Sequence, residues 1–139
     1  MSGYNTNLAA EFHVLSVLHR LGAAATLTLG NKKGVDIVVA REAGDAVTVE
    51  VKGVARRYDW PADNIQSATP NRHYVALVSF EGRIEDATAG PRCWVIPFQD
   101  LKPYLRQYKG RRNVSRSAVL KSGQQFENAL SRIIDPSGT

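Results

Sequence analysis

The sequence lacks the usual features of secreted and membrane-spanning proteins. Cys93 is the only cysteine among 139 residues, so no disulfide can form within the chain. No apolar run approaches the ~20 residues that a membrane-spanning helix needs. The first residues, MSGYNTN, do not contain the basic and then apolar segments of a signal peptide. We therefore expect a cytoplasmic protein that does not contact a membrane.

Acidic residues are also absent from one long stretch of the chain. Between Leu101 and Phe126 there are seven basic residues and no acid: Lys102, Arg106, Lys109, Arg111, Arg112, Arg116 and Lys121. The whole chain has a net charge of +5 and a pI of 9.6. This charge favours an anionic partner such as nucleic acid. A solvated basic surface is the alternative for this stretch.

The length suits one domain spanning residues 1–139. We expect its core at about 5–108 and a basic loop with a C-terminal helix at 109–139. Periodicity and turn residues predict helices at 7–21, 62–68, 100–108 and 124–134, and strands at 24–30, 35–41, 46–52, 74–80 and 93–98. Turns are expected at 30–34, 42–45 and 82–90, and a basic loop at 109–116. This order predicts an α/β fold with a mixed sheet flanked by helices.

Two acids and a lysine occupy one face of the predicted hairpin at 35–52. Side-chain alternation places Asp36 on one face of the first strand and Glu50 and Lys52 on one face of the second. A turn near Gly44 brings Asp36 opposite or diagonal to Glu50. Two neighbouring carboxylates repel each other unless a cation or a proton lies between them. A divalent cation with oxygen ligands would satisfy this pair, whereas a solvated strand face is the alternative.

Glu11 adds a third acid, on the apolar stripe of the first predicted helix. It follows Leu8 by three residues and precedes Leu15 by four, which directs its carboxylate toward the sheet. A buried carboxylate is costly unless it is paired or bound to a metal. A position at the edge of the stripe, where the helix dipole favours an acid, is equally consistent with the sequence.

The motifs Gly34-Val35-Asp36 and Val49-Glu50-Val51-Lys52-Gly53, after a helix that carries Glu11, resemble the PD-(D/E)xK phosphodiesterase superfamily. This superfamily includes restriction endonucleases and archaeal Holliday-junction resolvases. Small bacterial members of unassigned function are the most similar, with an Asn-Lys-Lys-Gly-Val-Asp entry and a later pair like YVALV and WVIPF. The resemblance covers residues 5 to 100. The proline that often precedes the motif aspartate is replaced here by Val35.

The resemblance implies a restriction-endonuclease-like core of αβββαβ order and a nuclease that depends on Mg²⁺ or Mn²⁺, with DNA favoured over RNA. The implied catalytic residues are Glu11, Asp36, Glu50 and Lys52. Asp36, Glu50 and the Val51 carbonyl would bind the metal, with Glu11 binding it directly or through water. Lys52 would orient the attacking water and stabilise the transition state. A homodimer is one oligomeric state that related enzymes suggest. An inactive module that binds nucleic acid or a protein partner is the alternative function.

Cations and aromatic residues suited to phosphates and stacked bases follow the motif lysine and recur in the acid-free stretch. The predicted nucleic-acid contacts are Arg56, Arg57, Tyr58, Trp60, Lys109, Arg111, Arg112 and Arg116. Tyr58 and Trp60 have the alternative role of covering the sheet. Gln66 is a candidate auxiliary polar group, and His73 begins a strand from which it could approach the site, although a lone histidine is more often structural.

Overall fold

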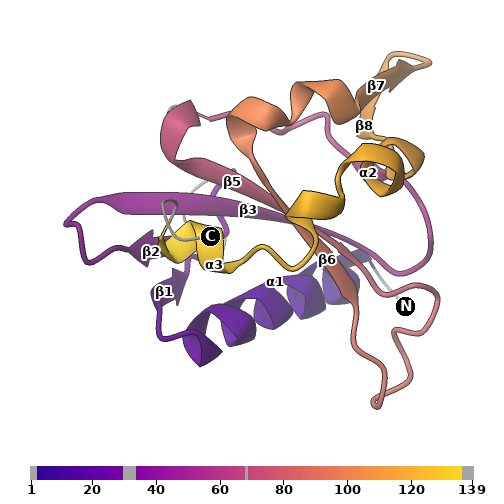
Figure 1. The fold of residues 1–139 in the computed structure, drawn as a ribbon. Helices are drawn as coiled ribbons and strands as arrows, with labels where there is room; N and C mark the ends of the chain where they lie inside the picture. The colour runs from indigo at the N-terminus through magenta and orange to yellow at the C-terminus, as the bar shows by residue number, and fades with distance from the viewer. Residues whose placement is uncertain (1–2, 30–33, 68, 136–139) are drawn as a thin grey trace.

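The computed structural model describes residues 3–29, 34–67 and 69–135 (Figure 1). The chain begins with the long helix α1 (Gly3–Arg20) and continues with strands β1 (Ala24–Leu27), β2 (Ile37–Ala40) and β3 (Ala46–Val54). The predicted turn at 30–34 falls almost wholly outside the described residues. None of the described helices is long and apolar enough to cross a membrane.

A mixed five-stranded sheet forms the centre of the molecule, in the order β1-β2-β3-β5-β6. Strands β5 (His73–Ser79) and β6 (Arg92–Pro97) complete it. β3 pairs antiparallel with β2 and parallel with β5, so it is an interior strand with hydrogen-bonded neighbours on both sides. The α/β class and the mixed sheet predicted from the sequence are confirmed.

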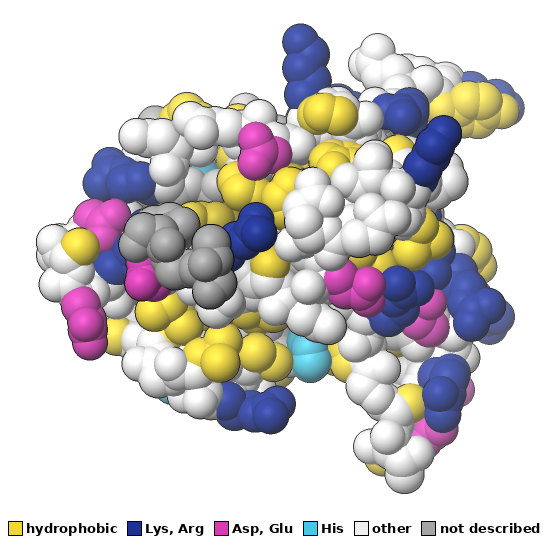
Figure 2. All heavy atoms as spheres, in the orientation of Figure 1, with side chains coloured by type: hydrophobic (Ala, Val, Ile, Leu, Met, Phe, Trp, Pro, Cys, Tyr) yellow, Lys and Arg dark blue, Asp and Glu magenta, His cyan; other side chains and the backbone are white. Residues whose placement is uncertain are grey.

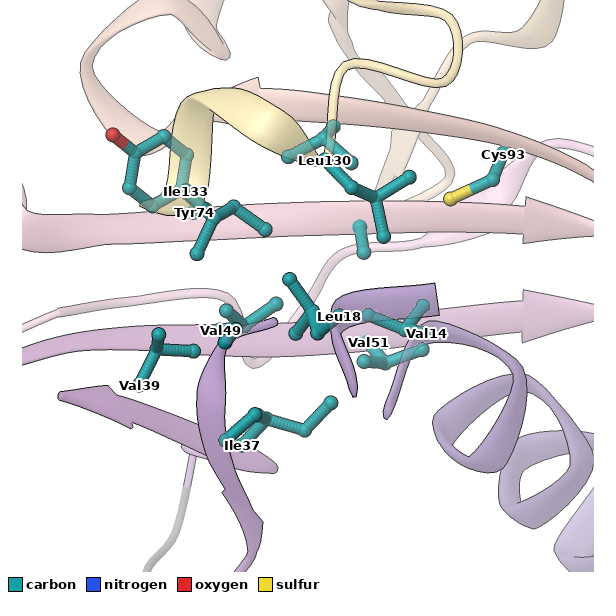
Figure 3. Close-up of a cluster of buried hydrophobic side chains, with 14 of the residues drawn as sticks. Val14, Leu18, Ile37, Val39, Val49, Val51, Tyr74, Cys93, Leu130 and Ile133 are labelled. Atoms are coloured by element: carbon teal, nitrogen blue, oxygen red, sulfur yellow. The ribbon is translucent and has the colours of Figure 1, made fainter. Parts of the chain in front are cut away.

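One face of this sheet is covered by α1 and by the short helix α3 (Ser131–Ile134), as Figure 3 shows. Val14 and Leu18 of α1 contact the alternate valines of β3, while Leu130 and Ile133 pack over β5 and β6. These side chains are almost completely buried. The alternation of β3 therefore places its valines in the core and leaves Glu50 and Lys52 on the opposite face.

The opposite face is covered by a second, three-stranded sheet of order β4-β8-β7 and by α2 (Arg116–Ser122). Its strands are β4 (Trp60–Pro61), β7 (Leu105–Tyr108) and β8 (Arg111–Val114). Trp60 and Trp94 meet edge to face in this second core, with ring centroids 5.6 Å apart. Their burial holds the small sheet against β5 and β6.

Several elements predicted from the sequence are wrong. Residues 100–108 do not form a helix: a 3-10 turn at Phe98–Asp100 and a second at Lys102–Tyr104 are followed by β7, which pairs with β8. The basic loop at 109–116 is the turn of a hairpin, strand β8 and the start of α2. The helix at 124–134 is a 3-10 turn (Gln124–Phe126) and the four-residue α3.

The αβββαβ order is also corrected. The connection between the parallel strands β3 and β5 contains β4 and a 3-10 turn (Pro70–Arg72), and its described residues form no α-helix. The Ala62 N–H donates to the Arg112 carbonyl at 2.9 Å, so the backbone at the start of the predicted helix is paired with β8 instead. The helix predicted at 62–68 is therefore not present in the described part of that segment, which runs to Ser67.

Candidate active site

A pocket of about 610 Å³ opens where the first half of α1 crosses the end of β3. Glu11, Asp36, Glu50 and Lys52 all line it. Glu11 comes from α1, Asp36 directly precedes β2, and Glu50 and Lys52 lie on β3. The structure therefore brings the four predicted catalytic side chains into one concave site.

Asp36 and Glu50 face each other across the β2–β3 pairing. Ile37 pairs with Val49, so the next position along the antiparallel register sets Asp36 opposite Glu50. The Asp36 N–H donates to the Val49 carbonyl at 2.9 Å. The Val51 N–H in turn donates to Asp36 Oδ2 at 2.7 Å, which orients this carboxylate. Backbone groups of Val49 and Val51 thus hold both the main chain and the carboxylate of Asp36.

Glu50 is buried, with only 3% of its surface exposed, and it has two basic neighbours. Lys52 Nζ lies 3.2 Å from Glu50 Oε2, and His73 Nε2 lies 3.8 Å from Glu50 Oε1. The other ring nitrogen of His73 forms a 2.6 Å hydrogen bond with Thr48 Oγ1. His73 is thus fixed against Glu50 by the strand that carries it and by Thr48 on β3.

Two acids of the pocket, Glu11 and Asp36, have pKa values raised above their ordinary range. Burial, and then the nearby charge of Asp36, raise the pKa of Glu11 from 4.5 to about 7. Burial also raises the pKa of Asp36, opposed by the hydrogen bond from Val51 and assisted by the charge of Glu50. Burial leaves the negative charge of these acids poorly solvated. A bound cation would neutralise it.

Gly53 permits the close approach of α1 to β3. A Cβ at position 53 would lie 2.6 Å from the Cβ of Ala10 and 3.2 Å from the Thr6 carbonyl oxygen. Because glycine has no such atom, the helix can pass directly over the strand. This contact brings Glu11, one residue beyond Ala10, to the rim that Lys52 also lines.

The donor set fits a divalent cation in part. Glu50 Oε1 is buried and has no hydrogen-bond partner among the described residues, so it is available to a ligand. The Val51 N–H points toward Asp36, and in a paired strand the carbonyl of the same residue points to the same edge. Among the described residues, no three Asp, Glu, His or Cys side chains already lie close enough together to hold a metal. Asp36 and Glu50, which lie opposite each other in the β2–β3 register, are the two carboxylates best placed to act as a pair of donors.

The predicted nucleic-acid contacts in the loop after β3 differ in their exposure to solvent. Tyr58 is 59% exposed and lines the pocket, and Arg56 and Arg57 are exposed beside it. Trp60 is fully buried, and its indole N–H donates to the Val78 carbonyl at 3.0 Å. The prediction that Trp60 contacts nucleic acid is therefore corrected, because its ring covers the sheet.

Two arginines of the acid-free stretch are used inside the molecule. Arg112 donates to the carbonyls of Ala62 and Ile65, at 2.8 to 3.1 Å. Arg116 forms a two-pronged ion pair with Glu81 at 2.7 and 2.8 Å, and only 13% of its side chain is exposed. Both guanidinium groups therefore have internal partners, which argues against the predicted contacts of Arg112 and Arg116 with nucleic acid. Lys109 and Arg111 are exposed.

The sequence suggested His73 only as a residue that could approach the site, and it did not point to Thr48 or Asn64 as site residues. His73 reaches Glu50 because β3 and β5 pair in parallel with Thr48 beside His73, a long-range register that local periodicity does not contain. Asn64 lines the pocket from the connection after β4. Gln66, which the sequence suggested as an auxiliary group, is exposed and does not line the pocket.

Comparisons with known proteins add no relative. No family model matches the chain, and neither the curated proteins nor the solved structures contain a significant match to it. The chemistry of the site is accordingly argued from its own residues.

Proposed function

We propose that the protein is a divalent-metal-dependent nuclease of the restriction-endonuclease-like fold, acting on DNA in preference to RNA. The observation that supports this most strongly is the meeting of Glu11, Asp36, Glu50 and Lys52 in one pocket. The interior position of β3, with an antiparallel partner on one side and a parallel partner on the other, agrees with such a core.

Asp36, Glu50 and the Val51 carbonyl would hold Mg²⁺ or Mn²⁺, and Glu11 would contact it directly or through water. When bound, the metal lowers the pKa of water and neutralises the charge that develops on the phosphate. Among the described residues that line the pocket, Lys52 carries the only ammonium group. Its Nζ, which lies 3.2 Å from Glu50 Oε2, would donate to a phosphate oxygen or orient the attacking water.

His73 would act as a positioning residue in this mechanism. It is bound to Thr48 and lies against Glu50 with only 1% of its side chain exposed, so solvent and substrate do not reach it. Its role is to fix the rotamer of Glu50 and hence the direction in which Oε1 points.

Cleavage assays with Mg²⁺ and Mn²⁺ test the proposal, on single-stranded, duplex, flap and four-way-junction DNA. We expect cleavage by the wild type that a chelator abolishes, and a loss of at least about 100-fold in Lys52→Ala, the size typical of removing one group that stabilises transition-state charge. Circular dichroism would show that the variant still folds. Absence of wild-type cleavage on all these substrates and on RNA would refute the nuclease proposal.

A binding module is a second candidate, favoured by one specific contact. The ion pair between Lys52 and Glu50 at 3.2 Å satisfies the lysine without a metal. A module of this kind would bind nucleic acid equally well with and without chelator, and Lys52→Ala would leave that binding unchanged. A chelator-sensitive cleavage activity decides between the two candidates.

A further inference from the structure

The basic segment after residue 104 is built as a tight hairpin. β7 and β8 pair from Leu105 with Val114 to Tyr108 with Arg111, so only Lys109 and Gly110 form the turn. Both turn residues have positive φ, 51° at Lys109 and 76° at Gly110. This is the two-residue type I′ turn, whose twist matches that of the strands it joins. The segment is therefore a preorganised arm.

The two faces of the arm differ in chemistry. Alternation places Leu105, Arg112 and Val114 on the inner face, where Val114 is fully buried and Arg112 binds the Ala62 and Ile65 carbonyls. Arg106, Tyr108 and Arg111 share the outer face and are exposed, Tyr108 to 66%. Arg106 Nη1 donates to the Pro103 and Leu105 carbonyls at 2.8 Å, yet the side chain remains exposed. The outer face is thus accessible to a partner, whereas the inner face is packed against the rest of the molecule.

The charge of the arm is entirely positive. Residues 105–114 contain four basic side chains and no acid. Figure 2 shows basic side chains projecting around the hairpin at the upper right of the molecule. The ion pair of Arg111 with Asp63 is 3.6 Å long, and 79% of the Arg111 side chain is exposed, so this pair is weak and easily exchanged for another anion.

Lys109 occupies a position that does not favour lysine. A residue with φ near 50° in a type I′ turn is usually asparagine, aspartate or glycine. Lysine at this position destabilises the turn, but it places a positive charge at the tip of the arm. Its Nζ lies 5.4 Å from the centre of the Tyr108 ring, so a cation and an aromatic face are presented together.

The arm begins at the rim of the pocket. Pro61, which lines the pocket, pairs with Asn113 of β8. Asp63 accepts a 2.7 Å hydrogen bond from the Arg112 N–H, which ties the same connection to the strand. Four residues of strand extend ~13 Å, about the length of four base pairs along a duplex at ~3.4 Å each. A nucleic acid placed over the pocket can therefore run along the arm.

We propose that the β7–β8 hairpin is a nucleic-acid-binding arm that contacts the sugar-phosphate backbone outside the pocket through Arg106, Lys109 and Arg111, with Tyr108 available to a base. The identity of the ligand rests on the proposed function, whereas the binding itself does not require the protein to cleave.

Salt-dependent binding tests the arm. The probe is a fluorescein-labelled DNA duplex of about 20 base pairs, long enough to cover pocket and arm, and anisotropy is measured with excess chelator so that cleavage plays no part. The double variant Lys109→Ala/Arg111→Ala should bind at least about tenfold more weakly, and the slope of log K against log salt should be shallower by about 0.9 for each phosphate that the variant no longer neutralises.

Two control variants separate the arm from general charge and from folding. Arg20→Glu lowers the net charge by the same two units at the far end of α1, and it should keep most of the affinity and the wild-type slope. Lys109→Asn suits the turn better than lysine, so it should melt at the wild-type temperature or above it and still bind more weakly.

Each outcome decides the proposal. An equal decrease in affinity in the double variant and in Arg20→Glu, unchanged binding by the double variant, or no wild-type binding to duplex or single-stranded DNA and RNA at low salt would overturn it. If the arm variants bind weakly but no substrate is ever cleaved, the nuclease proposal fails and the arm proposal stands. If the wild type cleaves DNA and the arm variants bind normally, the arm proposal fails and the nuclease proposal stands.

Discussion

Glu11 is the only acidic side chain of α1, and its surroundings make it the most easily tested residue of the site. It is half-buried at the pocket rim, close enough to Asp36 for the two charges to repel. A carboxyl group in this position holds its proton more tightly in the folded chain than in the unfolded chain. Its ionisation is therefore linked to stability.

We expect the protein without metal to lose stability as the pH rises from 4.5 to about 7, the interval between the ordinary and the folded pKa of Glu11. Between these values the folded state binds more protons than the unfolded state, so unfolding becomes easier as the pH rises. Glu11→Gln cannot ionise at this position. Its melting temperature minus that of the wild type should therefore increase between about pH 5 and pH 8. Glu42→Gln, which removes an exposed carboxylate from the β2–β3 turn, is the control. A difference between Glu11→Gln and wild type that does not change with pH would contradict the assignment.

Gly53→Ala should destabilise the fold by about 1–3 kcal/mol, the usual cost of forcing an extra group into a packed contact. The added Cβ would meet Ala10 at 2.6 Å and push α1 away from β3. Gly90→Ala is a matched control, since nothing lies within 4 Å of the Cβ it adds. Denaturant unfolding measures both variants, and equal stabilities would show that the helix can shift without cost.

At the scale of elements, two aromatic residues of β4 and the loop before it have different roles. Trp60 anchors β4 to the central sheet through its ring and its hydrogen bond to Val78. Tyr58, two residues earlier, extends over the pocket. Their different exposures predict opposite effects of substitution.

Trp60→Phe should lower stability by about 1–3 kcal/mol, because it removes the donor to a buried carbonyl and leaves a small void. We expect it to bind DNA as the wild type does at a temperature where both are folded. Tyr58→Ala should weaken DNA binding and leave the melting temperature nearly unchanged. The two variants are compared by thermal melting and by anisotropy. Weaker DNA binding by folded Trp60→Phe would indicate that Trp60 contacts nucleic acid despite its burial.

The elements also show what the sequence could and could not predict. The alternation of Val47, Val49 and Val51 sufficed to assign the faces of β3. The turn near Gly44 predicted Asp36 opposite or diagonal to Glu50, and the β2–β3 register sets it opposite. Leu101, Tyr104, Leu105 and Tyr108 have helical spacing, yet they form turns and a strand. Pairing of Leu105–Tyr108 with β8 supplies backbone hydrogen bonds that local periodicity does not reveal.

At the scale of the whole molecule, the pocket lies at the junction of α1, the central sheet and the β3–β4 connection. A ligand that binds there contacts elements that must all be in place at once. Binding to the folded state alone raises stability in proportion to the logarithm of ligand concentration over Kd. A cation at this site should therefore stabilise the entire fold.

Mn²⁺ at about 100 times its Kd should add about 2.7 kcal/mol to the free energy of unfolding. Glu50→Gln, whose amide carries no charge to attract the ion, should show a much smaller gain over its own metal-free value. Asp100→Asn, which changes an exposed acid away from the pocket, should respond as the wild type does. Calorimetric melting with and without chelator measures the gain, and an equal gain in Glu50→Gln would exclude Glu50 as a ligand.

The hydrogen bond from the Val51 amide to Asp36 Oδ2 has a spectroscopic consequence. The resonance of this amide depends on the charge of the carboxylate that it contacts, so it reports directly on what Asp36 binds. In an amide-resolved NMR titration, Val51 should shift early as metal is added, while the amides of β6 on the far side of the sheet remain in place. The backbone of β3 therefore contains its own indicator of whether the pocket is occupied.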